Sequence, residues 1–161
     1  MIRDIVLGII PPNVFTNPVY ALVATITSCV VFLVFYWKRQ LLEGHMRLTY
    51  DRVMLVMDSI GLGIFTVVGV NTGIRSGYMD NVFLLVFLGT ITGVGGGLMR
   101  DMMAGVPPYI FVKHIYACAS IIGAIVCVYM NRFVGNVEAM VVSSVVVVLI
   151  RYLAAHYHWN L

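Results

Sequence analysis

The sequence predicts an all-α membrane protein in which inverted three-helix repeats are followed by a final helix. Three observations lead to this prediction. Of the 161 residues, 61% are hydrophobic and only 11% are charged, whereas soluble domains carry about 25% charged residues. Five apolar runs are each long enough to cross a bilayer. A motif near the N-terminus also recurs in the second half of the chain, three of these runs later.

The apolar runs define the expected helices in order. Residues 1–10 are apolar but too short to cross a membrane, because a spanning helix needs about 20 residues. Polar or turn-forming segments separate the longer runs, and the longest of these segments is basic. We expect the five membrane-crossing helices at Pro18–Trp37, Val53–Thr72, Val82–Met103, Phe111–Met130 and Val137–Ala155.

The expected organisation has four parts, whose orientation follows from the basic residues. Seven Lys and Arg residues lie on the side that holds the long polar segment, against three on the other side. Because basic residues collect in cytoplasmic loops, that segment and the C-terminus are predicted to be cytoplasmic. The parts are the remainder of a first repeat (1–37), a cytoplasmic loop (38–52), a second inverted repeat (53–131), and a final helix with a short tail (132–161).

The repeated motif consists of an Arg-Asp pair, a glycine and two adjacent prolines. Arg3-Asp4 and Pro11-Pro12 recur as Arg100-Asp101 and Pro107-Pro108. An odd number of crossings separates the copies, so the second copy is inverted, an arrangement typical of transporters and related channels. A span and a glycine-rich half-helix precede the second copy. We therefore expect the first helix and half of the second helix to be missing from this chain, with a short asymmetric protein as the alternative.

The glycine-rich stretch before the second motif is the predicted functional element. Gly95, Gly96 and Gly97 are adjacent, and each interior glycine costs a helix about 1 kcal/mol relative to alanine. A broken helix that frees backbone carbonyls toward a pore or substrate path is therefore expected. Of Thr90 and Thr92, we expect one to line this path and the other to hydrogen-bond to its own helix.

Two other sets of residues have structural as well as functional interpretations. Gly89 and Gly93 are four residues apart, as are Gly69 and Gly73, and Gly97 continues the first series; such spacing favours close helix packing. Asp58 lies inside the second run, either on the path or simply hydrated.

The charged pairs of the motif also need partners. Arg100 and Asp101 are about 100° apart on a helix and are not expected to face each other. We expect Arg3 and Asp4 to be their partners across the repeat, with capping of helix carbonyls by Arg100 as the alternative.

Several function classes are excluded by what the sequence lacks. It shows no metal-ligand spacing, no catalytic Ser-His-Asp or Cys-His set and no paired catalytic carboxylates. The glycine triplet has no strand before it, so it does not match a nucleotide-binding loop. A net charge of +3 without a basic helix does not indicate nucleic-acid binding. We expect no enzymatic activity, no cofactor, no metal and no nucleic-acid partner.

The motif Gly93–Pro108, preceded by Asp58–Phe65 and repeated as Arg3–Pro12, resembles the trimeric intracellular cation channel (TRIC) family. Its bacterial branch is also known as UPF0126 and as the glycine transporter family. The resemblance covers essentially the whole chain. It implies a homotrimer in the cell (inner) membrane, a potassium-selective pore within each subunit, and glycine-kinked second and fifth helices that shape the pore. A secondary transporter of a small amino acid such as glycine is the alternative function.

Overall fold

The computed structural model describes residues 2–12, 18–38, 46–112 and 115–157. Every regular element within these ranges is an α-helix. The chain forms two compact units, Met1–Leu55 and Val56–Leu161, and the boundary between them falls inside one long helix. Each unit is described by itself.

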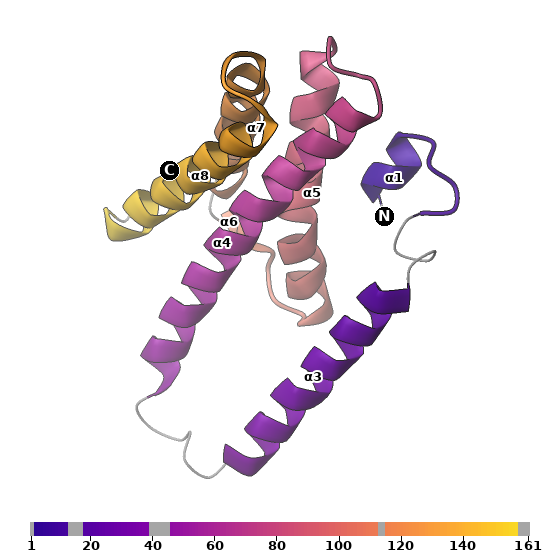
Figure 1. Cartoon of the computed structure of the whole chain (residues 1–161). Coiled ribbons are helices and arrows are strands. Elements are labelled where there is room, and N and C mark those ends of the chain that lie inside the picture. The colour runs from indigo at the N-terminus through magenta and orange to yellow at the C-terminus, as the bar shows by residue number, and fades with distance from the viewer. Residues whose placement is uncertain (1, 13–17, 39–45, 113–114, 158–161) are drawn as a thin grey trace. The chain divides into compact units, whose positions relative to one another are not determined.

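The first unit contains the helices α1 (Ile2–Val6) and α3 (Pro18–Lys38) (Figure 1). α3 matches the first predicted span closely. Its two threonines are satisfied within the helix, because the hydroxyls of Thr25 and Thr27 donate to carbonyls one turn earlier, at 2.9 and 2.8 Å. An apolar helix can therefore carry these threonines without unpaired polar groups.

The second unit holds four helices that are long and apolar enough to cross a membrane. Helix α4 (Met46–Arg75) and helix α5 (Val82–Met103) are joined by a short turn and run in opposite directions (Figure 1). The short helix α6 (Tyr109–Val112), then α7 (Ile115–Phe133) and α8 (Asn136–His156), complete the unit. The candidate spans confirm the four later runs predicted from the sequence and lie at Val53–Arg75, Val82–Met103, Ile115–Phe133 and Asn136–Ala155.

Two predicted boundaries are wrong. The polar segment 38–52 is helical from residue 46 onward, because α4 begins at Met46. That part of the segment contains no Gly or Pro, and Met, Arg and Leu are good helix formers, so the transmembrane helix continues past its apolar part. Helix α7 begins later than the predicted run Phe111–Met130, at Ile115, and also ends later, at Phe133; residues 113–114 of that run lie outside the described residues.

The prediction that α5 is broken is also wrong, because its helical structure is not interrupted. α5 is helical throughout Val82–Met103, including Gly95, Gly96 and Gly97. Three interior glycines cost about 3 kcal/mol relative to alanine. An unwound segment inside a bilayer would leave several backbone groups without partners, at several kcal/mol each. Continuous helical hydrogen bonding is therefore the less costly arrangement.

Small residues allow the helices of the second unit to approach closely. A Cβ atom built on Gly69 of α4 would lie 2.6 Å from the Leu88 carbonyl oxygen and 2.8 Å from the Gly89 Cα atom of α5. One built on Gly89 would lie 2.7 Å from Val70 Cγ2 and 3.1 Å from Ala124 Cβ of α7. Such contacts are how helices associate in lipid, where burial of apolar surface provides little driving force.

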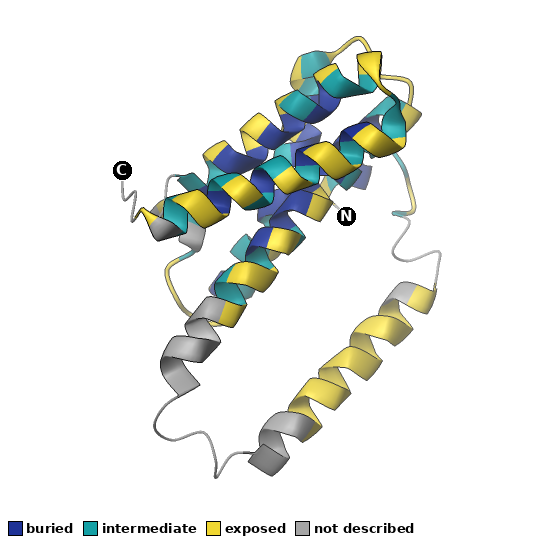
Figure 2. Ribbon diagram, turned by 60° about the vertical axis from the view of Figure 1, so that its left-hand side comes forward, coloured by how far each residue is buried: buried dark blue, intermediate teal, exposed yellow. Residues whose placement is uncertain are grey.

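The other packing glycines act in the same way. Gly73 of α4 leaves no room for a Cβ beside the side chains of Leu85 and Leu88, and Gly93 of α5 leaves none beside Thr66 Oγ1. In Figure 2 the buried residues of this unit lie where its helices face one another, and the exposed residues point outward.

Two polar contacts lie inside this packed unit, away from its charged residues. The hydroxyls of Thr66 and Ser120 form a buried hydrogen bond of 2.8 Å between α4 and α7. A chain of carboxamides joins three helices: Asn131 Nδ2 donates to Asn136 Oδ1 at 3.0 Å, and Asn136 Nδ2 donates to Asn71 Oδ1 at 2.8 Å. Interhelical hydrogen bonds of this kind fix helix register.

The repeated sequence motif ends its helix in the same way in both units. After α1, the amides of Leu7, Gly8 and Ile9 donate to the carbonyls of Arg3, Ile5 and Asp4. After α5, the amides of Ala104, Gly105 and Val106 donate to those of Arg100, Met102 and Asp101. The glycines have φ values of 70° and 66°, which a glycine adopts without strain. The sequence repeat therefore has a structural counterpart, while its inverted orientation stays a prediction.

Candidate functional site

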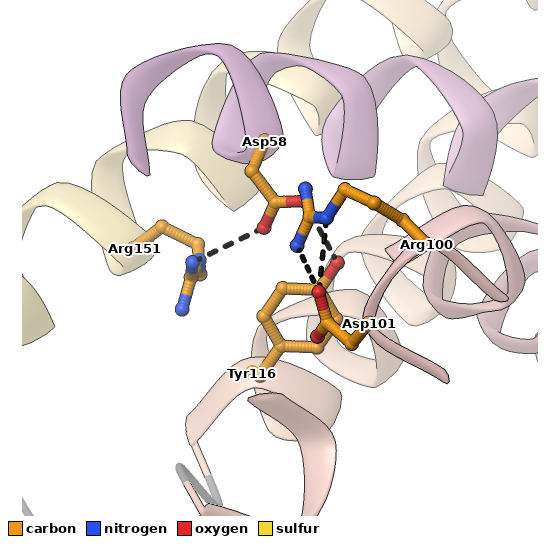
Figure 3. A network of polar contacts seen from close by, with 5 residues as sticks. All are labelled: Asp58, Arg100, Asp101, Tyr116 and Arg151. Atoms are coloured by element: carbon orange, nitrogen blue, oxygen red, sulfur yellow. Dashed lines mark hydrogen bonds and ion pairs between the residues drawn. The ribbon is translucent and has the colours of Figure 1, made fainter. Parts of the chain in front are cut away.

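Five polar side chains gather at one end of the second unit and form a single network. Figure 3 shows that α4, α5, α7 and α8 each contribute to it: Asp58 from α4, Arg100 and Asp101 from α5, Tyr116 from α7, and Arg151 from α8. Ionisable residues are rare inside spanning helices, and there they usually serve a pathway or a specific pair. This cluster is therefore the candidate functional site.

Arg100 bridges the two carboxylates. Its Nη1 donates to Asp58 Oδ1 at 2.9 Å, while its Nε and Nη2 lie 2.9 Å from Asp101 Oδ1. The expectation that Arg100 and Asp101 do not face each other is wrong. Their Cβ atoms do diverge, but the guanidinium at the end of a long side chain bends back around the helix to reach its neighbour.

Arg151 approaches Asp58 from the opposite side. Its Nη2 lies 3.5 Å from Asp58 Oδ2, and its guanidinium carbon lies 4.6 Å from the centre of the Tyr116 ring. The ring face is electron-rich, so it attracts the cation. The Tyr116 hydroxyl also donates to Asp58 Oδ1, at 3.5 Å.

The cluster is electrically neutral and well shielded. Two carboxylates face two guanidiniums, and the side chains of Arg151 and Asp101 are each 5% exposed and that of Asp58 is 11% exposed. Buried charges are tolerated when they are paired in this way. Arg100 is the accessible member, at 32% exposure. Among the described residues there is no group of three side chains able to hold a metal ion.

Gly97 belongs to this cluster as well as to the glycine triplet. A Cβ atom built on it would lie 2.6 Å from the Tyr116 hydroxyl oxygen and 3.5 Å from Asp58 Oδ1. The absence of a side chain at this position is thus what allows the tyrosine hydroxyl to reach the carboxylate.

The remaining residues of the predicted path lie elsewhere on α5. A Cβ atom built on Gly95 or Gly96 would meet nothing within 4 Å, and Gly96 is exposed. Thr90 and Thr92 both donate to their own helix, to the carbonyls of Val86 and Leu88 at 2.8 and 2.6 Å. The expectation that only one of them does so is wrong, because both hydroxyls lie within reach of the carbonyl one turn earlier.

Arg3 and Asp4 form their own pair in the first unit. Arg3 Nε and Nη2 lie 2.9 and 2.8 Å from Asp4 Oδ1. The same two nitrogens of Arg100 contact Asp101, so the two Arg-Asp pairs share their local geometry. Each adjacent pair is thus satisfied within its own helix end, which the sequence interpretation did not foresee.

Two members of the cluster were missed in the sequence. Neither Arg151 nor Tyr116 is among the predicted site residues, although an arginine inside the last apolar run is itself a sign of a buried partner. No spacing rule connects residues 58, 116 and 151, which come together only in the folded chain.

These features define a helical membrane protein with several helices long and apolar enough to cross the bilayer, in which Asp58, Arg100, Asp101 and Arg151 form one neutral cluster. A family model described as Glycine transporter matches residues 55–132. The UPF0126 inner membrane protein YadS of Escherichia coli K12 is 33% identical over 162 residues, which cover 99% of this chain and 73% of that protein. YvgT of Bacillus subtilis, another UPF0126 membrane protein, is 25% identical with the same coverage of both chains.

Solved structures give the same result. The chain matches a TRIC cation channel with a TM-score of 0.79 and 31% identity, over 99% of this chain and 74% of the channel. It matches the TRIC orthologue of Rhodobacter sphaeroides with a TM-score of 0.83 and 25% identity, over 98% and 76%. The chain belongs to the TRIC family, whose bacterial members are also called UPF0126 proteins.

Proposed function

We propose that this chain forms a cation channel in the inner membrane, with potassium as the permeant ion and a homotrimer as the assembly. The observation that carries this proposal is the match to solved TRIC cation channels over nearly the whole chain, at a TM-score of 0.79 to 0.83. One of the matched structures is described as a prokaryotic TRIC channel in 0.5 M KCl. No enzymatic role is proposed.

We place the ion path along α5, beside Gly95, Gly96 and Gly97. No atom outside the immediate helix neighbourhood lies within 4 Å of a Cβ atom built on Gly95 or Gly96, and Gly96 is exposed, so this bare stretch of backbone is open to an ion. Because α5 stays helical, the path would follow this narrow part of the helix rather than a row of freed carbonyls. Thr90 and Thr92 donate their hydrogens to their own helix, so the oxygen lone pairs stay available to a cation.

Asp58 and the Arg100–Asp101 pair would set the electrostatics near this path. A bare carboxylate would hold a cation tightly, whereas conduction requires binding weak enough to release the ion. Asp58 shares its charge with Arg100 and Arg151, which supports a weak interaction with a passing cation. Arg100 is the most exposed of the three side chains and is the one that could move.

The orientation proposed for the channel places the C-terminus and the segment 38–52 in the cytoplasm. This proposal rests on the distribution of Lys and Arg between the two sides of the predicted topology. The relatives from Escherichia coli are named inner membrane proteins, which supports the same membrane for this chain.

A secondary transporter of a small amino acid is the alternative, supported by the description of the matched family model as Glycine transporter. The two functions predict different results in transport measurements. Planar-bilayer recording of the purified chain should show discrete potassium currents if it is a channel. Saturable glycine counterflow in vesicles, without such currents, would instead indicate a transporter.

A further inference from the structure

Tyr116 is the uncharged side chain of the network in Figure 3, and it contacts both a carboxylate and a guanidinium. Its ring lies under the Arg151 guanidinium at 4.6 Å, and its hydroxyl donates to Asp58 Oδ1 at 3.5 Å. The residue is also buried, with an exposed fraction of 2%. One side chain thus touches both the carboxylate and one of the two cations that share it.

The position of the Tyr116 hydroxyl depends on Gly97. A Cβ atom at position 97 would lie 2.6 Å from the hydroxyl oxygen but 3.5 Å from the ring carbon that carries it. An alanine methyl would therefore collide with the oxygen alone, and the contact would be an ordinary one if that oxygen were removed. The third glycine of the triplet thus has a specific neighbour, unlike Gly95 and Gly96.

We propose that Tyr116 is a positioning residue of the cluster, and that Gly97, by lacking a side chain, leaves the space that its hydroxyl occupies. This space is called the seat of the hydroxyl below. In this arrangement the hydroxyl restrains the Asp58 carboxylate between Arg100 and Arg151, so that each oxygen keeps its own guanidinium. The Tyr116 hydroxyl would thereby limit how readily the Asp58 carboxylate turns toward a passing cation. This effect on ion flux rests on the proposed function.

The proposal predicts the direction of two substitutions. Tyr116→Phe removes the hydroxyl but keeps the aromatic face under Arg151, so Asp58 loses a restraint while the charge pairs remain. Gly97→Ala pushes the hydroxyl off its seat and has the same effect on Asp58. Both should raise potassium flux per folded protein by about threefold, the factor that corresponds to an average interhelical hydrogen bond of about 0.6 kcal/mol.

The double variant Gly97→Ala/Tyr116→Phe tests whether both substitutions act through one hydroxyl. Its flux should equal that of Tyr116→Phe alone. Gly97→Ala by itself should lower the melting temperature by about 5 °C, because overpacking a tight contact costs roughly 1–3 kcal/mol. Added to Tyr116→Phe, it should lower the melting temperature by no more than about 1 °C, since the remaining contact is ordinary.

Two matched controls separate these effects from general ones. Gly61→Ala places a methyl on α4 that meets only Phe65, at 3.9 Å. Tyr129→Phe removes a hydroxyl from an exposed position of α7. Neither control should change flux. Tyr129→Phe should leave the melting temperature unchanged, and Gly61→Ala should raise it slightly, because alanine is a better helix former than glycine.

The opposite results would overturn the proposal. If Gly97→Ala lowers flux equally with and without Tyr116→Phe, Gly97 sets the width of the path and does not seat the hydroxyl. If Tyr116→Phe changes flux no more than Tyr129→Phe does, Tyr116 has no positioning role. If the unsubstituted chain shows no cation flux, the proposed function fails. The melting temperatures of the unsubstituted chain, Gly97→Ala, Tyr116→Phe and the double variant then decide by themselves whether Gly97 makes room for the hydroxyl, since additive shifts would reject this.

Discussion

The Arg100 guanidinium contacts the Asp58 carboxylate at 2.9 Å and so links α5 to α4 across 42 positions of the chain. At the other end of the same two helices, the turn 76–81 joins them covalently. The antiparallel pair is thus held at both ends, by the chain at one and by an ion pair at the other. The glycine contacts of Gly69 and Gly89 lie between the two ends and hold the helices close.

Asp58→Asn should destabilise the second unit while leaving its shape intact. Asparagine keeps a carbonyl oxygen for Arg100 but removes the negative charge that Arg100 and Arg151 share. Breaking a buried ion pair costs roughly 3–5 kcal/mol, and the partial exposure of Arg100 reduces this to about 2–3 kcal/mol. A fall in melting temperature of about 5–10 °C is expected, measured by circular dichroism in detergent.

Asp80→Asn is the matched control, because Asp80 is exposed in the turn between α4 and α5. It removes the same charge without touching the cluster and should leave the melting temperature unchanged. Equal melting temperatures for the two variants would mean that the ion pairs of Asp58 do not contribute to stability.

The helices could be predicted from the sequence because lipid imposes a simple length and composition rule on them. The runs near Val82–Met103 and Val137–Ala155 match α5 and α8 within a residue or two. Boundaries in polar segments could not be predicted in this way. Residues 46–52 are too polar to belong to the apolar run, yet they contain good helix formers and no residue that would stop α4 from starting there.

The charged cluster could be predicted only in part. Asp58 and the Arg100–Asp101 pair were visible as ions within apolar runs. Their pairing was not, because Arg151 lies 93 positions beyond Asp58 and no local periodicity brings them together. The break in α5 was predicted from the cost of adjacent glycines in a helix that also carries charged residues, and this prediction gave too little weight to the larger cost of leaving backbone groups unpaired in a bilayer.

Gly69→Ala should force α4 and α5 apart. The added methyl would lie 2.6 Å from the Leu88 carbonyl oxygen and 2.8 Å from the Gly89 Cα atom, both of which are backbone and cannot rotate away. A loss of about 1–3 kcal/mol is expected, seen as a lower melting temperature in detergent. Gly61→Ala on the same helix is the control, and a loss of equal size there would show that helix packing at Gly69 is not the cause.

Asn136→Ala should loosen the end of the unit opposite the charged cluster. Asn136 is the middle member of the carboxamide chain, so its loss leaves Asn71 and Asn131 each without a partner that they have in the structure. We expect a cost of about 1 kcal/mol, in the range of interhelical hydrogen bonds in membrane proteins.

Ser76→Ala serves as the comparison for this substitution. It removes a hydrogen bond made within one exposed turn of α4 and should cost less. Hydrogen exchange at the start of α8, measured by mass spectrometry, should increase in Asn136→Ala only. Unchanged exchange there would show that the carboxamide chain does not fix the helix end.

Gly96→Leu should abolish ion flux and leave the folded protein intact. A side chain at this exposed position of α5 meets nothing within 4 Å of its Cβ atom, so leucine fits the second unit without strain. Leucine is also a far better helix former than glycine, by about 0.8 kcal/mol, so stability should not fall. The substitution thus fills the proposed path without disturbing the helix that forms it.

Potassium flux into vesicles, normalised to inserted protein, measures the effect. Phe83→Leu, which places leucine at another exposed position of α5, should conduct like the unsubstituted chain. Flux through Gly96→Leu at that same level would place the path away from the glycine triplet, because no ion could pass a site occupied by leucine at an unchanged rate.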